Sequence, residues 1–183
     1  PGSRWFYVPE GRLTESTHTQ ANDWGLMVLP DSLGDSVGWM GYWYEHGSTL
    51  VDRTIYNRGY PNADSATRLD DLEDAGISHD LDHLYGDPTP CKIGAFKSPG
   101  GDSNWNRVID HSCDAGAGQS GSPLYLYSPN TGDPVVTGVH IASSCGQTTN
   151  HPACGPNDDT PLRAVRLTPD HTDTIAYFRE AFQ

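Results

Sequence analysis

Apolar positions along the chain fall in short runs that Gly, Pro, Asn or Asp interrupt, the pattern of β-strands separated by turns. Nine such runs are predicted strands, at residues 4–8, 24–29, 37–44, 50–57, 92–96, 107–110, 123–127, 135–141 and 163–167. Between the runs 123–127 and 135–141 lie Ser, Pro, Asn, Thr, Gly and Asp, a composition that favours a hairpin loop. The chain is therefore expected to be mainly β.

One helix is predicted, at the C-terminal end. Thr168, Pro169 and Asp170 form a helix start signal with Pro in the first turn. Ile175, Phe178 and Phe182 follow at spacings of three and four, so they share one helix face. We expect many strands closed by this C-terminal helix.

Residues 62–87 break the strand pattern with a dense set of carboxylates: Asp64, Asp70, Asp71, Glu73, Asp74, Asp80, Asp82 and Asp87. We interpret residues 61–90 as a long solvated loop inserted between two parts of the fold. A calcium loop needs oxygen ligands alternating around a central Gly, and that alternation is missing. His79 and His83 would suit zinc only on a helix, with no evident third ligand, so exposed histidines are favoured. No metal ion and no cofactor is expected.

Composition narrows the class of protein. The chain has 183 residues, with 11 Lys+Arg against 24 Asp+Glu and a net charge of −13. This length fits one domain or two small packed lobes. The negative charge argues against nucleic-acid and anionic-membrane partners, and no apolar run approaches the roughly 20 residues of a membrane span. Four Cys and few Lys are typical of a secreted, disulfide-bonded protein. Residues 1–3, Pro-Gly-Ser, are either native or left by cleavage of an expression tag.

The segment from Asp114 to Leu124 carries the candidate chemistry, with the sequence Asp-Ala-Gly-Ala-Gly-Gln-Ser-Gly-Ser-Pro-Leu. A serine hydroxyl is a poor nucleophile unless a base takes its proton and donors stabilise the oxyanion. The glycines around Ser120 allow a tight turn that aims the backbone amides of Gly118 and Ser120 at one point. A Gly/Ser-rich loop without chemistry is the alternative, so the surrounding sequence decides.

This loop resembles the nucleophile loop of the chymotrypsin-like serine peptidases, above all of the glutamyl-endopeptidase branch, which carries Gly-Asn/Gln-Ser-Gly-Ser-Pro. The resemblance extends from about Trp5 to the C-terminal helix, with the acidic segment as an insertion. The further similar segments are residues 22–29, 33–34 and 38–42 around an aspartate, the Gly-Tyr-Pro at 59–61, Cys113-Asp114, and Gly138-Val139-His140. Their combination is specific, although no single segment is.

The resemblance implies an all-β fold, a chymotrypsin-like double β-barrel with a C-terminal α-helix. Residues 1–60 would form a partial first β-barrel lobe and the crossover. Residues 61–90 would be the acidic loop insertion, and residues 91–183 the second β-barrel lobe with the nucleophile loop. A different all-β sandwich is the alternative.

The same resemblance implies the catalytic roles. Ser120 would be the nucleophile, and the amides of Gly118 and Ser120 would form the oxyanion hole. Asp23, just before an apolar strand, would orient the catalytic imidazole and stabilise its cation. A turn-capping aspartate is the alternative for Asp23. The family's general-base histidine lies well upstream of the aspartate, and here only His18 precedes Asp23, without a strand-like context or a following Cys.

We therefore expect the chain to start downstream of the catalytic histidine. Three explanations are open: a precursor processed into two chains that stay associated, a truncated chain, or a non-catalytic relative that acts as a binding module. A first lobe short of strands would expose sheet edges and apolar surface, which favours the first. The predicted function is that of a secreted serine endopeptidase that acts on protein or peptide substrates, with its histidine on a separate N-terminal chain. A catalytically inactive peptidase-like binding protein is the alternative.

Specificity depends on two candidate groups with opposite charge preferences. His140 and Ser143 lie on the strand that walls the primary pocket in this family, and an imidazole with a hydroxyl can bind a carboxylate. Asp114, six residues before Ser120, matches the position at which trypsin-like relatives hold Lys or Arg, although an Asp there also occurs in glutamyl-specific relatives. We expect cleavage after Glu or Asp, with cleavage after Arg or Lys as the alternative. A histidine satisfied within the core is the alternative for His140.

The four cysteines allow three connectivities. We pair Cys91 with Cys113, which flank the strand pair leading into the nucleophile loop, and Cys145 with Cys154, which would close a local loop. Metal ligation is disfavoured because no Cys-Xaa2-Cys pair exists.

Overall fold

The computed structural model describes residues 5–9, 20–45, 47–60, 84–86, 90–96, 107–113, 115, 118–143 and 162–182. Its elements, in chain order, are β1 (Trp5–Tyr7), η2 (Gln20–Asn22), β2 (Leu26–Val28), α2 (Gly34–Val37), β3 (Gly41–Tyr42), α3 (Gly47–Leu50), β4 (Thr54–Gly59), β5 (Tyr85–Gly86), β6 (Cys91–Phe96), β7 (Val108–His111), β8 (Pro123–Tyr127), β9 (Pro134–Ser143), β10 (Leu162–Arg166) and α5 (Pro169–Ala181). Each predicted strand contains or overlaps one of these strands, and α5 is the predicted helix.

Four short elements were not predicted: β5, the 3-10 turn η2 and the single helical turns α2 and α3. Both α-helical turns take a residue from a predicted strand, Val37 in α2 and Leu50 in α3. A single turn shows no repeat of apolar spacing, so the hydrophobic pattern contains no signal for it.

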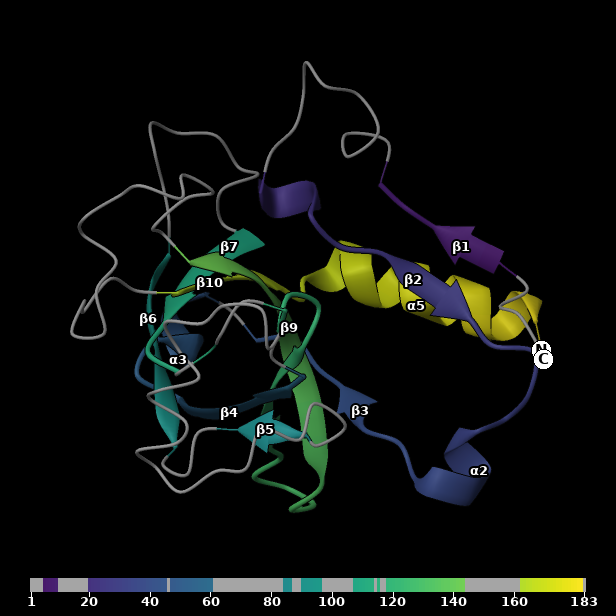
Figure 1. Cartoon of the computed structure of the whole chain (residues 1–183), viewed down its shortest axis with the longest axis horizontal. Helices are drawn as coiled ribbons and strands as arrows, with labels where there is room; N and C mark the ends of the chain where they lie inside the picture. Colours follow the sequence, from purple (N-terminus) through teal and green to yellow (C-terminus); the bar gives the residue numbers. More distant parts are fainter. Residues whose placement is uncertain are drawn as a thin grey trace.

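Six strands close into an antiparallel barrel. Going round it, the hydrogen-bonded neighbours are β4, β6, β7, β10, β9, β8 and again β4. β3 adds to β9 in parallel and β5 adds to β4. Figure 1 shows the barrel on one side of the molecule and α5 on the other. Closure gives each of these six strands a hydrogen-bonded neighbour on both sides.

The first barrel strand precedes the acidic segment. β4 pairs with β6 and β8, and both of these strands follow that segment. The boundary predicted at residue 60 places β4 in the first lobe, whereas its partners β6 and β8 lie in the predicted second lobe.

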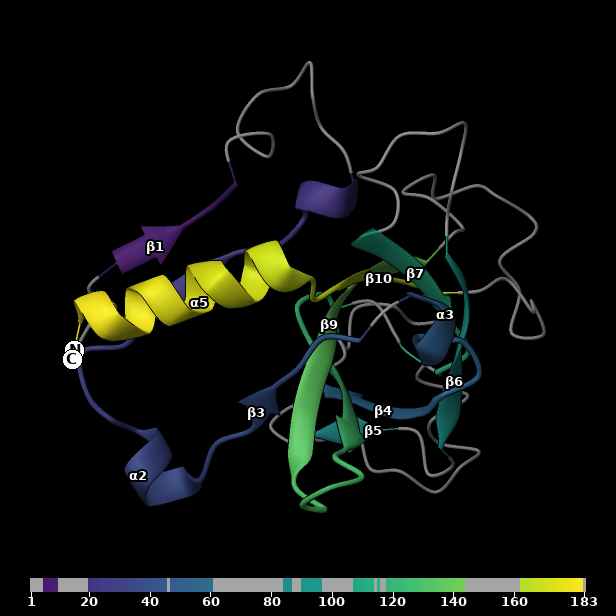
Figure 2. The same ribbon diagram turned by 180° about the vertical axis from the view of Figure 1, so that it is seen from behind.

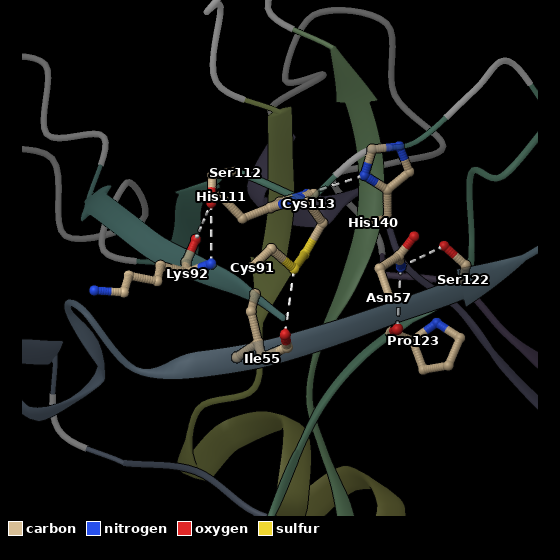
Figure 3. The surroundings of a disulfide bond; sticks show 10 residues. All are labelled: Ile55, Asn57, Cys91, Lys92, His111, Ser112, Cys113, Ser122, Pro123 and His140. Carbon is tan, nitrogen blue, oxygen red and sulfur yellow. Dashed lines mark hydrogen bonds between the residues drawn. A yellow bond between two sulfur atoms is a disulfide. The ribbon is translucent and has the colours of Figure 1, made fainter. Parts of the chain in front are cut away.

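The barrel core consists of aliphatic side chains around a disulfide. Ile55, Ile93 and Leu124 are fully buried there. Cys91 at the start of β6 and Cys113, two residues after the neighbouring strand β7, form the predicted disulfide shown in Figure 3. Closing a loop of this size raises the free energy of unfolding by about 3 kcal/mol, because the crosslink lowers the entropy of the unfolded chain. Cys145 and Cys154 lie outside the described residues.

The remaining part of the described chain is a two-stranded ribbon beside α5. β1 pairs with β2 in antiparallel fashion. Ring contacts join the ribbon to the helix: the centroids of Trp5 and Phe182 lie 5.5 Å apart, as do those of Tyr7 and Phe178. Figures 1 and 2 show the ribbon along α5 from both sides. The partial first lobe expected in residues 1–60 stays a prediction.

Large apolar side chains around the ribbon are exposed. Phe6 is 71% exposed, and Val37 and Trp39 near α2 are 82% and 78% exposed. Among the described helices, none combines the length and the apolar character that a membrane span needs.

Candidate active site

Ser120 lies on a tight turn immediately before β8. Gly118 has φ 92° and Gly121 has φ 91°, a left-handed conformation that glycine adopts at little cost. The two glycines therefore bend the chain on either side of Ser120. The Ser122 amide donates to the Gln119 carbonyl at 3.0 Å and closes the turn, while the Ser120 side chain stays exposed.

Backbone hydrogen bonds attach this turn to β9. The Gly121 amide donates to the His140 carbonyl at 2.8 Å, and the His140 amide donates to the Ser122 carbonyl at 2.9 Å. The Ser120 Oγ donates to the Ile141 carbonyl at 3.3 Å. The turn and His140 are thus held side by side.

Two backbone donors of the turn remain unused. In the part of the chain that the structure describes, the amides of Gly118 and Ser120 have no hydrogen-bond acceptor. Two amides one residue apart on such a turn can donate to one negative oxygen, which is the arrangement that an oxyanion-binding site requires. This is the pair of donors that the sequence singled out.

His140 forms a buried pair with a residue that sequence reasoning did not select. Its Nδ1 lies 3.1 Å from the Nε2 of His111 on β7, and Figure 3 shows the other ring nitrogen of His140 pointing away from His111. The two rings are nearly perpendicular, at 76°. The strands β7 and β9 are separated by β10, so only barrel closure brings these histidines together.

Burial keeps both imidazoles neutral near pH 7. Burial lowers the pKa of His140 to about 4. Burial, followed by repulsion from a charged His140, lowers the pKa of His111 to about 3, against an opposing effect of the Arg163 backbone. One ring therefore donates a hydrogen bond to the other. A carboxylate that approached His140 would favour its protonated form and raise its pKa again.

Asp23 follows η2, which is anchored to the barrel. The Asp23 amide donates to the Gln20 carbonyl at 3.1 Å, and the Arg163 Nη1 on β10 donates to the Gln20 Oε1 at 3.0 Å. On the other side, the Trp24 ring lies 4.6 Å from the His171 ring of α5. The turn of Ser120 and the turn of Asp23 are thus attached to neighbouring barrel strands, β9 and β10.

The three described histidines do not accept a hydrogen bond from Ser120, since its Oγ donates to a backbone carbonyl. His111 and His140 bind each other. His171 caps α5, where its Nδ1 lies 3.2 Å from the Thr168 amide and 2.6 Å from the Thr168 Oγ1. His18, Asp114 and the side chain of Ser143 lie outside the described residues.

Comparison with known proteins shows which architecture this is. No protein-family model matches the chain, and no curated protein matches its sequence. Seven chains of solved structures match, among them the structure of a Glu endopeptidase in complex with MPD, with a TM-score of 0.62 over 97% of this chain. The chain has the chymotrypsin-like fold. Its identity to that Glu endopeptidase is 17%, and it spans 63% of that chain's length.

The expected fold class is therefore confirmed: a mostly β, chymotrypsin-like architecture with a C-terminal helix. At 17% identity the match shows the fold alone. Any statement about the reaction of this chymotrypsin-like chain depends on the side chains and amides around Ser120.

Proposed function

We propose that this chain is the main part of a secreted serine endopeptidase with Ser120 as its nucleophile. The observation that carries the proposal is the Ser120 turn: an exposed hydroxyl between two left-handed glycines, where the amides of Gly118 and Ser120 have no acceptor among the described residues. A chymotrypsin-like fold around this turn supports peptide-bond hydrolysis. The buried disulfide supports an oxidising, extracellular location.

In the proposed reaction, a general base takes the proton of the Ser120 hydroxyl while the Oγ attacks the carbonyl carbon of the scissile bond. The amides of Gly118 and Ser120 donate to the oxyanion that develops. The protonated base then gives its proton to the leaving amine, which breaks the C–N bond and leaves an acyl-enzyme. Water hydrolyses this ester by the reverse sequence, and Asp23 orients the base throughout.

The base is proposed to be a histidine on a separate N-terminal chain of the same precursor. Within the described residues, His111, His140 and His171 have the other contacts given above. The ribbon with the exposed Phe6 on β1 and, separately, the exposed Trp39 after α2 are proposed as surfaces that such a segment would cover. A two-chain enzyme of this kind would be active only as the complex.

Cleavage is proposed to follow Glu, and to a lesser extent Asp. His140 lies beside the turn of Ser120, and its Nε2–H, which points away from His111, would donate to the substrate carboxylate. His111 supports the ring from behind. Ser143 on the same strand is proposed as a further ligand, whereas Asp114 would favour Arg or Lys instead.

Hydrolysis of matched peptides tests both parts of the proposal. The native complex is given peptides that differ only at the residue before the scissile bond. We expect Glu peptides to be cleaved fastest, Ser120→Ala to cleave none, and His140→Ala to lose the preference for Glu. Faster cleavage of Arg and Lys peptides, with a preference that survives in His140→Ala, would refute the specificity alone. Undiminished cleavage by Ser120→Ala would refute the nucleophile.

A further inference from the structure

Asn57 joins β4 to the end of the Ser120 turn. It is 1% exposed, and its Nδ2 donates to the Ser122 Oγ at 2.8 Å and to the Pro123 carbonyl at 3.1 Å, as Figure 3 shows. A backbone carbonyl accepts only, so the atom that faces Pro123 must be the amide nitrogen. The orientation of the Asn57 side chain is thereby determined.

The strand pairing explains why β4 reaches the turn. Asn57 lies opposite Leu124 in the β4–β8 ladder, one residue beyond Pro123. Two residues further along β4, a Cβ on Gly59 would lie 2.9 Å from the Ser122 Cβ and 3.1 Å from the Gln119 Cγ. β4 therefore packs directly against the two residues that flank Ser120 and Gly121.

A polar residue at this position is costly for the barrel. A buried amide loses its hydration and regains it only through hydrogen bonds. The Asn57 Oδ1 is buried without a hydrogen-bond partner among the described residues. An apolar side chain of similar size would avoid this cost, as Ile55 does one inward position earlier on β4. Unlike an apolar side chain, Asn57 fixes Ser122 and Pro123 through its two hydrogen bonds.

Movement of Ser122 would move the candidate reactive groups. Its amide and its carbonyl are bonded to Gln119 and His140, so its position defines one end of the turn. The amides of Gly118 and Ser120 lie at and before the centre of that turn. Misplacement of a reacting group by about 1 Å can cost about 100-fold in rate.

We propose that Asn57 is a positioning residue of the proposed peptidase. Its amide holds Ser122 and Pro123, and through them it sets the direction of the Ser120 hydroxyl and of the two oxyanion-binding amides. This inference rests on the proposed function. The proposed carboxylate ligand His140 on β9 is also bonded to Gly121, so loss of Asn57 should act mainly on kcat and change KM for a Glu peptide less.

The test uses the native complex with Asn57→Leu, which removes both hydrogen bonds at similar volume, and Ser122→Ala, which removes one acceptor. Ile55→Val is the matched control, a fully buried change on the same strand that leaves the turn untouched. We expect Asn57→Leu to lower kcat about 10- to 100-fold with a smaller change in KM, without a fall in melting temperature. The control is expected to lower the melting temperature and keep kcat.

Two further results decide the proposal. In the double variant Asn57→Leu/Ser122→Ala, kcat should fall no further than in Asn57→Leu alone. The hydrogen bond that Ser122→Ala removes is already lost in Asn57→Leu. A folded Asn57→Leu protein with kcat within twofold of the parent, or a kcat that falls only in step with the melting temperature, overturns the positioning role. A parent complex without any hydrolysis overturns the proposed function, and this inference with it.

Discussion

The barrel and the β1–β2 ribbon differ in strand pairing and in how well their apolar side chains are buried. Each barrel strand pairs on both sides, and the core residues such as Ile55 and Ile93 are fully buried. The ribbon has two strands, contacts α5 through aromatic rings, and leaves Phe6 71% exposed. The candidate nucleophile lies on the turn before β8 of the barrel, whereas Asp23 lies between η2, which is bonded to β10, and β2 of the ribbon. Stability should therefore depend on the barrel, and activity on both.

Beyond Ser120 itself, the largest effect is expected at Asp23. Asp23→Asn should lower kcat by about 10⁴-fold, by analogy with the corresponding change in serine-protease triads, because the base loses its orientation. The melting temperature of the barrel should stay unchanged. Steady-state hydrolysis and thermal unfolding of the native complex measure the two quantities. An Asp23→Asn enzyme with the parental rate would refute the proposed catalytic role of Asp23.

The second effect concerns the barrel alone. Replacing Cys91 and Cys113 together by Ala should lower the free energy of unfolding by about 3 kcal/mol, since the bridge closes a loop across the core. Trp5→Ala, which removes a ring contact with Phe182 at the ribbon, should cost less. Denaturant unfolding compares the two variants. A larger loss of unfolding free energy in Trp5→Ala would contradict the claim that stability depends mainly on the barrel.

Features with a signal in neighbouring residues were predicted, whereas contacts between residues far apart in the sequence were not. The strands, α5 and the turn of Ser120 have local signals in apolar spacing and in glycine, and all of these appear in the structure. The pair of His111 and His140 and the contact of Asn57 with Ser122 arise only when the barrel closes. Their residues are 29 and 65 positions apart, so no pattern of neighbouring residues indicates them.

A third effect is a loss of stability on mild acidification. Burial lowers the pKa of His111 to about 3 and that of His140 to about 4. Burial, then the charge of Arg107, lowers the pKa of His171 to about 4. In the unfolded chain these histidines bind protons near pH 6.5. Their contribution to the free energy of unfolding is therefore fully present above that pH and is lost as the pH falls towards 4.

Unfolding at pH 7.5, 6.5, 5.5 and 5.0 measures this loss. Each histidine contributes a slope of up to about 1.4 kcal/mol per pH unit. His171→Gln, at the junction of α5 and the ribbon, should make the slope shallower while the barrel pair keeps the remainder. A free energy of unfolding that is constant from pH 7.5 to 5.0 would contradict the burial of these neutral rings.

The smallest effect on stability is expected at the exposed surface near the ribbon. Trp39→Ser should change the free energy of unfolding by less than about 0.5 kcal/mol, since the side chain is 78% exposed. It should, however, weaken association with the histidine-bearing chain. Tyr127→Ser, an exposed change on the barrel, is the matched control. Equal affinity of both variants for that chain would exclude the surface around Trp39 as its binding site.

Labelling of the native, unreduced protein with a fluorophosphonate, followed by intact-mass and peptide analysis, tests the central claim most directly. The reagent bonds only to a serine whose hydroxyl a base activates. We predict one adduct, located on Ser120, absent from Ser120→Ala and present in Ser36→Ala, together with a second associated chain in the unreduced sample. A folded protein that takes up no label, with that chain present, would contradict the account and identify a peptidase-like binding protein.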